Sequence, residues 1–294
     1  MLSKRFWKKF VIRFTSVFRK QPAVTVYNFL GANSHRRFSQ LQTICFFIGH
    51  TRSGHTLLGS ILDAHPQIVI ATEANMMDIL EQKGLTKKGL FFFLYNWSKF
   101  IAIFLGNRSA GYSYKVKGGD QGRAKNIRVI GDNKGKGTLL KLQKNPSLLT
   151  RLHEISGLDS KVIYCSRNPF DMISTQYLKN GKSSENINYD YLQSRIDIFK
   201  EQSLWIHRLI HSSALDIHVM HNEDLVSRPK EEIEALVRYL DVPYTNEFIE
   251  KTSGIIFEDS RKTRFKIEWA EELIKDLEDH CQTLPFLTRY NYQD

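Results

Sequence analysis

The sequence predicts an α/β fold of three layers, in which helices flank a central and mostly parallel β-sheet. Short runs of β-branched and apolar residues recur along the chain, and segments with helical spacing of apolar residues separate them. Unbroken apolar strands that alternate with helices are typical of a parallel sheet covered on both faces. The 294 residues, 41% hydrophobic and 25% charged, can bury a core and exclude a mostly disordered chain.

Five apolar runs are predicted to be buried strands, namely 43–49, 68–71, 127–131, 162–166 and 217–221. The first predicted helix follows residue 54, where apolar residues recur at helical spacing until Pro66 stops the pattern. Further helices are expected at 138–156, 170–179, 189–213, 229–240 and 267–280. The apolar block 90–106 predicts a buried helix or a pocket wall, and the glycine-rich segment 107–126 predicts a loop.

The N-terminus combines basic and aromatic residues. Residues 1–20 contain seven Lys and Arg residues, with Phe6, Phe10 and Phe14 at helical spacing. They form neither a signal peptide nor an apolar stretch of the roughly 20 residues that a membrane span needs. We therefore expect a basic leader at 1–40 and a single domain at 41–294. A mobile leader and a weak contact with an anionic membrane through residues 1–20 both remain open.

The net charge indicates which classes of ligand the protein binds, and the cysteine content indicates its cellular compartment. The formal net charge of +11 favours polyanionic ligands such as nucleotides, nucleic acid, sulfated or phosphorylated molecules, or anionic lipid. Cys45, Cys165 and Cys281 include no C-x-x-C pair, so neither a disulfide framework nor a zinc site is indicated. Together with the lack of a membrane anchor, the cysteines predict a cytoplasmic protein.

The stretch GHTRSGHT, from Gly49 to Thr56, nearly matches the phosphate-binding loop G-x-x-x-x-G-K-[ST]. A strand, a glycine turn and a helix place backbone N–H groups and a positive helix end around one point, which suits an anion. The fold is therefore expected to be P-loop-like. His55 stands where the lysine belongs, and Arg52 lies inside the loop.

One hypothesis is a Mg²⁺-dependent nucleotide kinase. In this interpretation Thr56 and Asp132, which follows the run IRVIG, would hold the metal. His55 weakens the hypothesis, because histidine is mostly neutral at pH 7 and too short to replace the lysine.

The longer segment FIGHTRSGHTLLGSILDAHPQIVIATE resembles the 5′-phosphosulfate loop of sulfotransferases that use 3′-phosphoadenosine 5′-phosphosulfate (PAPS). Tyrosylprotein sulfotransferases and small bacterial sulfotransferases are the most similar. The resemblance implies that the phosphosulfate is bound without a metal by five consecutive residues, Arg52, Ser53, Gly54, His55 and Thr56. It extends from about residue 43 to 290 and is weak between 80 and 125.

The segment VIYCSRNPFDMISTQY resembles the family's second motif, which binds the 3′-phosphate with an arginine and a serine. Arg167 matches the arginine. Thr175 takes the place of the serine and Ser174 lies one residue early, so either hydroxyl fits the motif. Near the C-terminus the resemblance places Arg261 and Lys262, in a cluster with Ser260 and Arg264, where the family closes over the nucleotide.

Sulfuryl transfer needs a base for the acceptor and a donor for the leaving oxygen. The resemblance implies that Glu73 is the base, since it follows the run IVIA at the strand end where that glutamate stands. In the segment GDNKGKGT, Lys134 matches the lysine near the transferred group, with Lys136 as the competitor. The resemblance also implies that Arg52 stabilises the bridging oxygen.

Neighbouring polar residues have secondary roles. Asp132 would orient Lys134 or the loop, and His65 in the D-A-H-P turn is structural. His50 and His55 flank the loop and are further candidates for a base or a phosphate donor.

Together these motifs predict an enzyme that moves a sulfuryl group from PAPS to a hydroxyl or amine of a small-molecule acceptor by in-line displacement. The product 3′,5′-bisphosphate (PAP) is then released, and no metal is needed. A non-catalytic basic module that binds nucleic acid or anionic lipid is the third hypothesis. Nucleic acid is not the expected partner, because the chain lacks basic motifs interleaved with aromatic residues.

Overall fold

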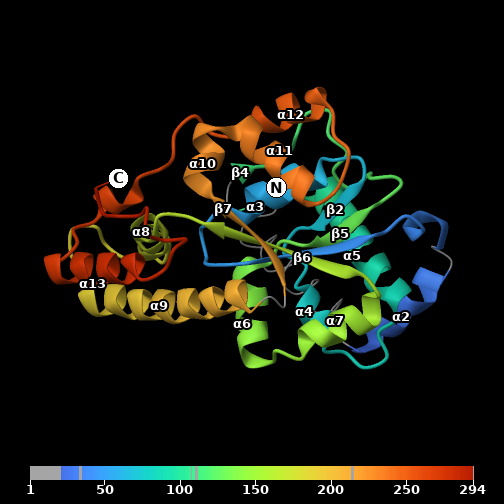
Figure 1. Cartoon of the computed structure of the whole chain (residues 1–294), viewed down its shortest axis with the longest axis horizontal. Helices are drawn as coiled ribbons and strands as arrows, with labels where there is room; N and C mark the ends of the chain where they lie inside the picture. The colour runs from blue at the N-terminus through green and yellow to red at the C-terminus, as the bar shows by residue number, and fades with distance from the viewer. Residues whose placement is uncertain (1–20, 33–34, 107, 110–111, 213–214, 294) are drawn as a thin grey trace, which may run out of the picture.

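A five-stranded sheet forms the centre of the molecule (Figure 1). The computed structural model describes residues 21–32, 35–106, 108–109, 112–212 and 215–293, and residues 1–20 lie outside this part. In sequence order the strands are β1 (Thr43–Ile48), β2 (Ile68–Ala71), β5 (Val129–Asp132), β6 (Asp159–Ser166) and β7 (Asp216–His221). Their order across the sheet is β2-β5-β1-β6-β7, and each neighbouring pair is parallel. The five predicted strands and the predicted fold class are confirmed.

Helices cover both faces of the sheet, because side chains alternate along each buried strand. Ile44, Phe46 and Ile48 of β1 belong to one apolar core, whereas Cys45 and Phe47 belong to the other. The second core is closed by α3 (His55–Asp63), α10 (Asn222–Ser227), α11 (Pro229–Tyr239) and α12 (Asn246–Ser253). The first core is closed by α2 (Gln21–Ala32), α4 (Met76–Leu80), α5 (Lys87–Phe104), α6 (Gly135–Lys144), α7 (Leu148–Ser156), α8 (Pro169–Lys179), α9 (Tyr189–His211) and α13 (Glu271–Gln282).

Two helix predictions are corrected. The predicted helix 138–156 is two helices, α6 and α7, because Pro146 lies between them and cannot continue the backbone hydrogen bonds of a helix. The predicted helix 267–280 begins later, as α13 at Glu271, because Ile267 and Ala270 have extended backbone conformations after the 3-10 turn Thr263–Lys266. The predicted loop 107–126 contains a short hairpin of β3 (Arg108–Ser109) and β4 (Tyr112–Ser113).

The apolar block 90–106 forms most of α5, a helix with a buried face. Helix α2 packs against it: Val24 and Tyr27 are buried, and the ring centroids of Tyr27 and Phe93 are 5.1 Å apart. Part of the predicted leader 1–40 thus joins the core, while the division of the chain at residue 40 stays a prediction. No helix of the described residues is long and apolar enough to cross a membrane.

The D-A-H-P turn after α3 fixes the start of β2. The carboxylate of Asp63 accepts hydrogen bonds from the backbone N–H of Ile70 at 2.9 Å and from the hydroxyl of Ser98 at 2.9 Å. Burial raises the pKa of Asp63 to about 7. His65 bonds the carbonyl oxygen of Pro243 through Nε2 at 2.9 Å, so its role is structural as predicted.

Candidate active site

The turn between β1 and α3 has the backbone that an anion-binding loop needs. Gly49 and Gly54 have φ values of 139° and 109°, which favour glycine, and Arg52 also has a positive φ of 76°. A Cβ on Gly54 would lie 2.6 Å from the side-chain nitrogen of Asn222. Helix α3 then begins at His55. The backbone N–H groups of its first turn and its positive end therefore face the space beyond the turn.

That space is a cavity of about 770 Å³ at the carboxyl ends of the strands. All five strands contribute to its lining through the residues that follow them: Arg52 after β1, Glu73 after β2, Lys134 after β5, Arg167 after β6 and Asn222 after β7. Ligands of parallel α/β sheets bind at this edge. Its volume is within the range of small-molecule and cofactor sites.

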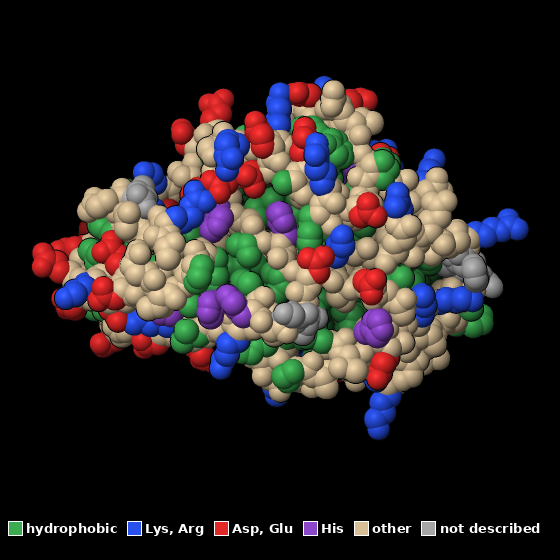
Figure 2. Space-filling model, in the orientation of Figure 1, with side chains coloured by type: hydrophobic (Ala, Val, Ile, Leu, Met, Phe, Trp, Pro, Cys, Tyr) green, Lys and Arg blue, Asp and Glu red, His purple; other side chains and the backbone are tan. Residues whose placement is uncertain are grey.

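The cavity concentrates positive charge. Its acidic lining residues are Glu73 and Asp259. Its basic lining residues are Arg52, Lys134, Lys136, Arg167, Lys179, Arg261 and Lys266. On the face shown in Figure 2, by contrast, basic and acidic side chains are interspersed over the surface. The positive charge is thus arranged for a compact anionic ligand in the cavity.

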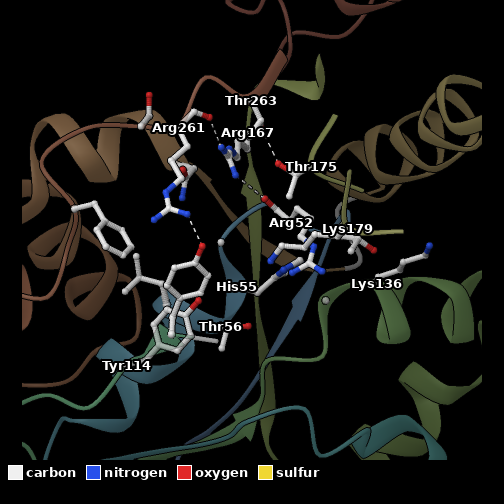
Figure 3. A pocket seen from close by; sticks show the side chains of 18 of the residues that line it. Arg52, His55, Thr56, Tyr114, Lys136, Arg167, Thr175, Lys179, Arg261 and Thr263 are labelled. Carbon is white, nitrogen blue, oxygen red and sulfur yellow. Dashed lines mark hydrogen bonds between the residues drawn. The ribbon is translucent and has the colours of Figure 1, made fainter. Parts of the chain in front are cut away.

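The two predicted binding motifs meet in this cavity (Figure 3). The guanidinium of Arg167 donates to the carbonyl oxygen of Arg52 at 3.2 Å and to that of Arg261 at 2.7 Å. The Nε atoms of Arg52 and Arg167 are buried and have no hydrogen-bond partner among the described residues. Since buried polar groups are normally satisfied, these donors indicate an anionic ligand between the two arginines.

The loop residues divide into those that face the cavity and those that support it. Arg52, Gly54, His55 and Thr56 line it. Ser53 does not: its side chain is fully buried, donates to the carbonyl oxygen of His50 at 3.0 Å and lies 3.2 Å from His55 Nε2.

Burial lowers the pKa of both loop histidines. The pKa of His55 falls to about 4 and that of His50 to about 3. Both rings are therefore neutral at pH 7. The ring of His50 turns away from the large cavity, with Nδ1 3.2 Å from Gln202 Oε1.

The structure also separates Thr175 from Ser174. Thr175 lines the cavity, and its hydroxyl is 2.8 Å from that of Thr263. Ser174 is fully buried and accepts a hydrogen bond from Trp269 Nε1 at 3.2 Å. Of the two hydroxyls, only that of Thr175 is in reach of a ligand in the cavity.

The C-terminal basic cluster divides in the same way. Arg261 lines the cavity, and its guanidinium bonds the hydroxyl of Tyr112. Lys262 is exposed and is not part of the lining. Arg264 is buried and forms an ion pair with Asp171 at 2.7 Å, so it supports the fold.

Glu73 and Lys134 form an ion pair in the cavity, which joins the predicted base to the predicted leaving-group lysine. The backbone of Glu73 has a positive φ of 56°, and two neighbours of Lys134 hold it there. Asn133 Oδ1 accepts from the Glu73 N–H at 2.8 Å, and the Asp132 carboxylate accepts from the N–H groups of residues 74 and 76 at 3.0 and 2.8 Å. Burial raises the pKa of Asp132 to about 7.

Asp132 therefore orients the turn that carries Glu73, and both of its oxygens are engaged by backbone amides. The kinase hypothesis needed this carboxylate for a metal. Within the described part of the chain, no group of three or more His, Cys, Asp or Glu side chains is placed to hold a metal ion.

Sequence reasoning missed several residues of the site. Asn133 precedes Lys134 in the sequence, but no sequence pattern predicts its hydrogen bond to the backbone of Glu73. Two tyrosines at the β3–β4 hairpin, Tyr112 and Tyr114, line the cavity together with Phe257 from a distant segment of the chain. The alternation of the two tyrosines in the predicted loop was the one available signal.

The sequence model of the Sulfotransferase family matches residues 45–246, which is more than half of the chain. A comparison with curated proteins finds no match in sequence.

The chain is similar in structure to several solved sulfotransferases. One is the sulfotransferase domain of the Synechococcus PCC 7002 olefin synthase, with a TM-score of 0.49, 16% identity and coverage of 83% of this chain and 94% of that chain. The sulfotransferase STF9 from Mycobacterium avium has a TM-score of 0.47 and 11% identity, and the match covers 88% of this chain and 81% of that one. The sulfotransferase domain of the curacin biosynthetic pathway has a TM-score of 0.47 and 16% identity, and the match covers 83% of this chain and 98% of that one. On the extent of the family match, the chain belongs to the sulfotransferase family.

Proposed function

We propose that the chain is a PAPS-dependent sulfotransferase that transfers a sulfuryl group to a hydroxyl or amine of a small-molecule acceptor. The observation that carries the proposal is the meeting of Arg52 and Arg167 in one cationic cavity, each with a buried and unpartnered Nε. A donor with one anionic group at each end of an adenosine is the ligand that two such sites fit.

The donor-binding roles follow from the lining. The first turn of α3, Arg52 and Thr56 bind the 5′-phosphosulfate, because a helix N-terminus and a guanidinium both favour an anion. Arg167 and Thr175 bind the 3′-phosphate. His55 contributes as a neutral group at the helix start, and Ser53 contributes by holding the loop.

At the C-terminal loop, Arg261 joins the 3′-phosphate site, since its carbonyl oxygen already accepts a hydrogen bond from Arg167. Lys262 adds positive charge at the rim. Ser174 contributes only through its packing next to Thr175.

Glu73 accepts the proton of the acceptor hydroxyl or amine while the acceptor atom attacks sulfur. Lys134 and Arg52 stabilise the negative charge that develops on the bridging oxygen as the bond between that oxygen and sulfur breaks. The Glu73–Lys134 ion pair places the carboxylate and the ammonium side by side in the cavity. The proposal includes no metal, because these side chains supply the positive charge.

Two experiments test the proposal. We expect isothermal titration calorimetry to show that the purified protein binds PAP more tightly than AMP. Arg167→Ala should lower the affinity for PAP by at least about tenfold, since charge-assisted bonds to phosphate are lost. Arg208→Ala, which removes an exposed arginine of α9, is the control. Equal affinity for PAP and AMP, unchanged by Arg167→Ala, contradicts the proposal.

EDTA separates the proposal from the kinase hypothesis. PAP binding and sulfuryl transfer from PAPS should both survive chelation, whereas a Mg²⁺-dependent kinase should lose activity and nucleotide affinity.

We also propose a cytoplasmic location, no nucleic-acid partner, and a weak contact with anionic membranes through residues 1–20. Vesicle binding that survives deletion of residues 1–20 would contradict the last point.

A further inference from the structure

A second and much smaller cavity adjoins the proposed active site. Thr51 and Lys136 line both cavities. The small one lies among the loop after β1, the first turn of α6, and the helices α8 and α9, and has a volume of about 20 Å³. It has room for about one water-sized group. It can therefore take the end of a ligand whose body occupies the large cavity.

Two cations face this small cavity without an acid to neutralise them. Lys136 and Arg195 are both half-buried, and neither forms an ion pair in the part of the chain that the structure describes. No acidic side chain lines the small cavity. Burial and the positive charge of Arg195 lower the pKa of Lys136. The two side chains are thus close enough to repel each other, and an anion between them would remove that repulsion.

A third group points to a ligand independently of the two cations. His50 lines the small cavity and is 3% exposed. Its Nδ1 faces Gln202, but its Nε2 has no hydrogen-bond partner among the described residues. A buried polar atom of this kind normally has a partner. A protic group of a ligand, or a water ordered by that ligand, would supply one.

Three other cations at the centre of the large cavity have assignments in the proposed function. Arg52 and Arg167 hold the two ends of the donor, and Lys134 is paired with Glu73. Lys136 lies two residues after Lys134, in the first turn of α6. Figure 3 shows Lys136 on the side of the cavity opposite Arg261. The small cavity is therefore an extension beside the reaction centre, with charge that the donor does not use.

We propose that the acceptor is an anionic molecule whose carboxylate, phosphate or sulfate group binds between Lys136 and Arg195. The inference rests on the proposed function, and it adds the chemical class of the acceptor. One oxygen of the anionic group occupies the small cavity, and the hydroxyl or amine that receives the sulfuryl group lies in the large cavity within reach of Glu73.

The test uses the full chain saturated with PAP and a panel of paired phenols. One member of each pair is anionic, as in 4-hydroxyphenylacetate or 4-hydroxyphenyl phosphate, and the other is the neutral alcohol 4-(2-hydroxyethyl)phenol. We expect the anionic members to bind at least about tenfold more tightly, as is typical of charge-assisted contacts. Arg195→Gln, which changes a residue that lines the small cavity and not the large one, should abolish this preference while PAP affinity and Tm stay unchanged. Lys136→Gln should abolish the preference as well. Lys144→Gln, an exposed cation of the same helix, is the matched control.

The outcomes distinguish a failure of the proposed acceptor class from a failure of the proposed donor. If PAP binds but no anionic probe is preferred, or if both variants keep the preference, the inference is wrong and the proposed function stands. If the wild-type protein does not bind PAP, the proposed function fails and the inference fails with it.

Discussion

The contact between Gly135 and the ring of His55 allows a sharp test of the site, because it joins α6 to the anion-binding loop. A Cβ at position 135 would lie 1.9 Å from Nε2 and 2.1 Å from Cδ2 of His55. Heavy atoms in a packed interior approach to about 3.5 Å, so Gly135→Ala must displace the ring by roughly 1.5 Å. The ring has little room to move, because Ser53 Oγ lies 3.2 Å from Nε2, and the backbone of Gly49 is so near that a Cβ there would lie 3.3 Å from the same atom.

The expected cost follows from this displacement. Overpacking of a buried site destabilises by about 1–3 kcal/mol, which lowers the Tm of a domain of this size by a few degrees. The loop moves with His55, so PAP affinity should fall by at least about tenfold, since shifts near 1 Å in a binding constellation have large effects.

Thermal unfolding and calorimetric titration with PAP measure both effects. The control is Gly254→Ala, where the nearest atom to an added Cβ is 3.5 Å away. We expect that variant to change the free energy of unfolding by less than about 0.5 kcal/mol. The double variant Gly135→Ala with His55→Ala should be no less stable than His55→Ala alone, because the ring is gone. A Gly135→Ala protein with wild-type Tm and PAP affinity refutes the reasoning.

Three further variants probe the chemistry and the core. Glu73→Gln should lower kcat by roughly 10²–10⁴-fold with PAP affinity retained, as expected for loss of a general base; loss of PAP binding instead would show that Glu73 is a binding residue. Arg264→Met leaves the Asp171 carboxylate buried without its partner. This variant should lower the free energy of unfolding, measured with urea, by about 3–5 kcal/mol, and a second change of Asp171→Asn should recover part of the loss. A wild-type urea midpoint for Arg264→Met alone would contradict the structural role of the ion pair. Burial raises the pKa of Asp63 from 3.8 to about 7, so its contribution to stability is full below pH 4 and is lost as the pH rises through 7. The free energy of unfolding of wild type relative to Asp63→Asn should therefore fall between pH 4 and pH 7, by at most roughly 4 kcal/mol, and a pH-independent difference would disprove this shift.

The strands and the candidate site could be predicted together for one physical reason. Once the apolar runs are parallel strands, the residues that follow them must gather at the same edge of the sheet. Arg52, Glu73, Lys134 and Arg167 each follow such a run, and the structure brings all four into one cavity. The sequence by itself thus determined the fold class and the strand ends that meet.

Side-chain direction was decided by tertiary packing. Ser174 and Thr175 are adjacent on α8, yet one bonds Trp269 in the core and the other faces the cavity. In the same way Arg261 lines the site, while Arg264 is drawn inward by the buried carboxylate of Asp171. Residues that are adjacent in the sequence have the same local pattern, but the side chain that orients each of them belongs to a distant segment of the chain.

The least predictable features depend on two or more such segments at once. Asn133 holds the backbone of Glu73, and Asp132 holds the turn beside it, so the position of the proposed base depends on the end of another strand. The arrangement of Lys136 and Arg195 beside His50 likewise requires α6, α9 and the loop after β1 to come together. The sequence determined which residues follow each strand, and only the tertiary structure decided which of them face each other, because facing is set by packing between segments that local patterns do not describe.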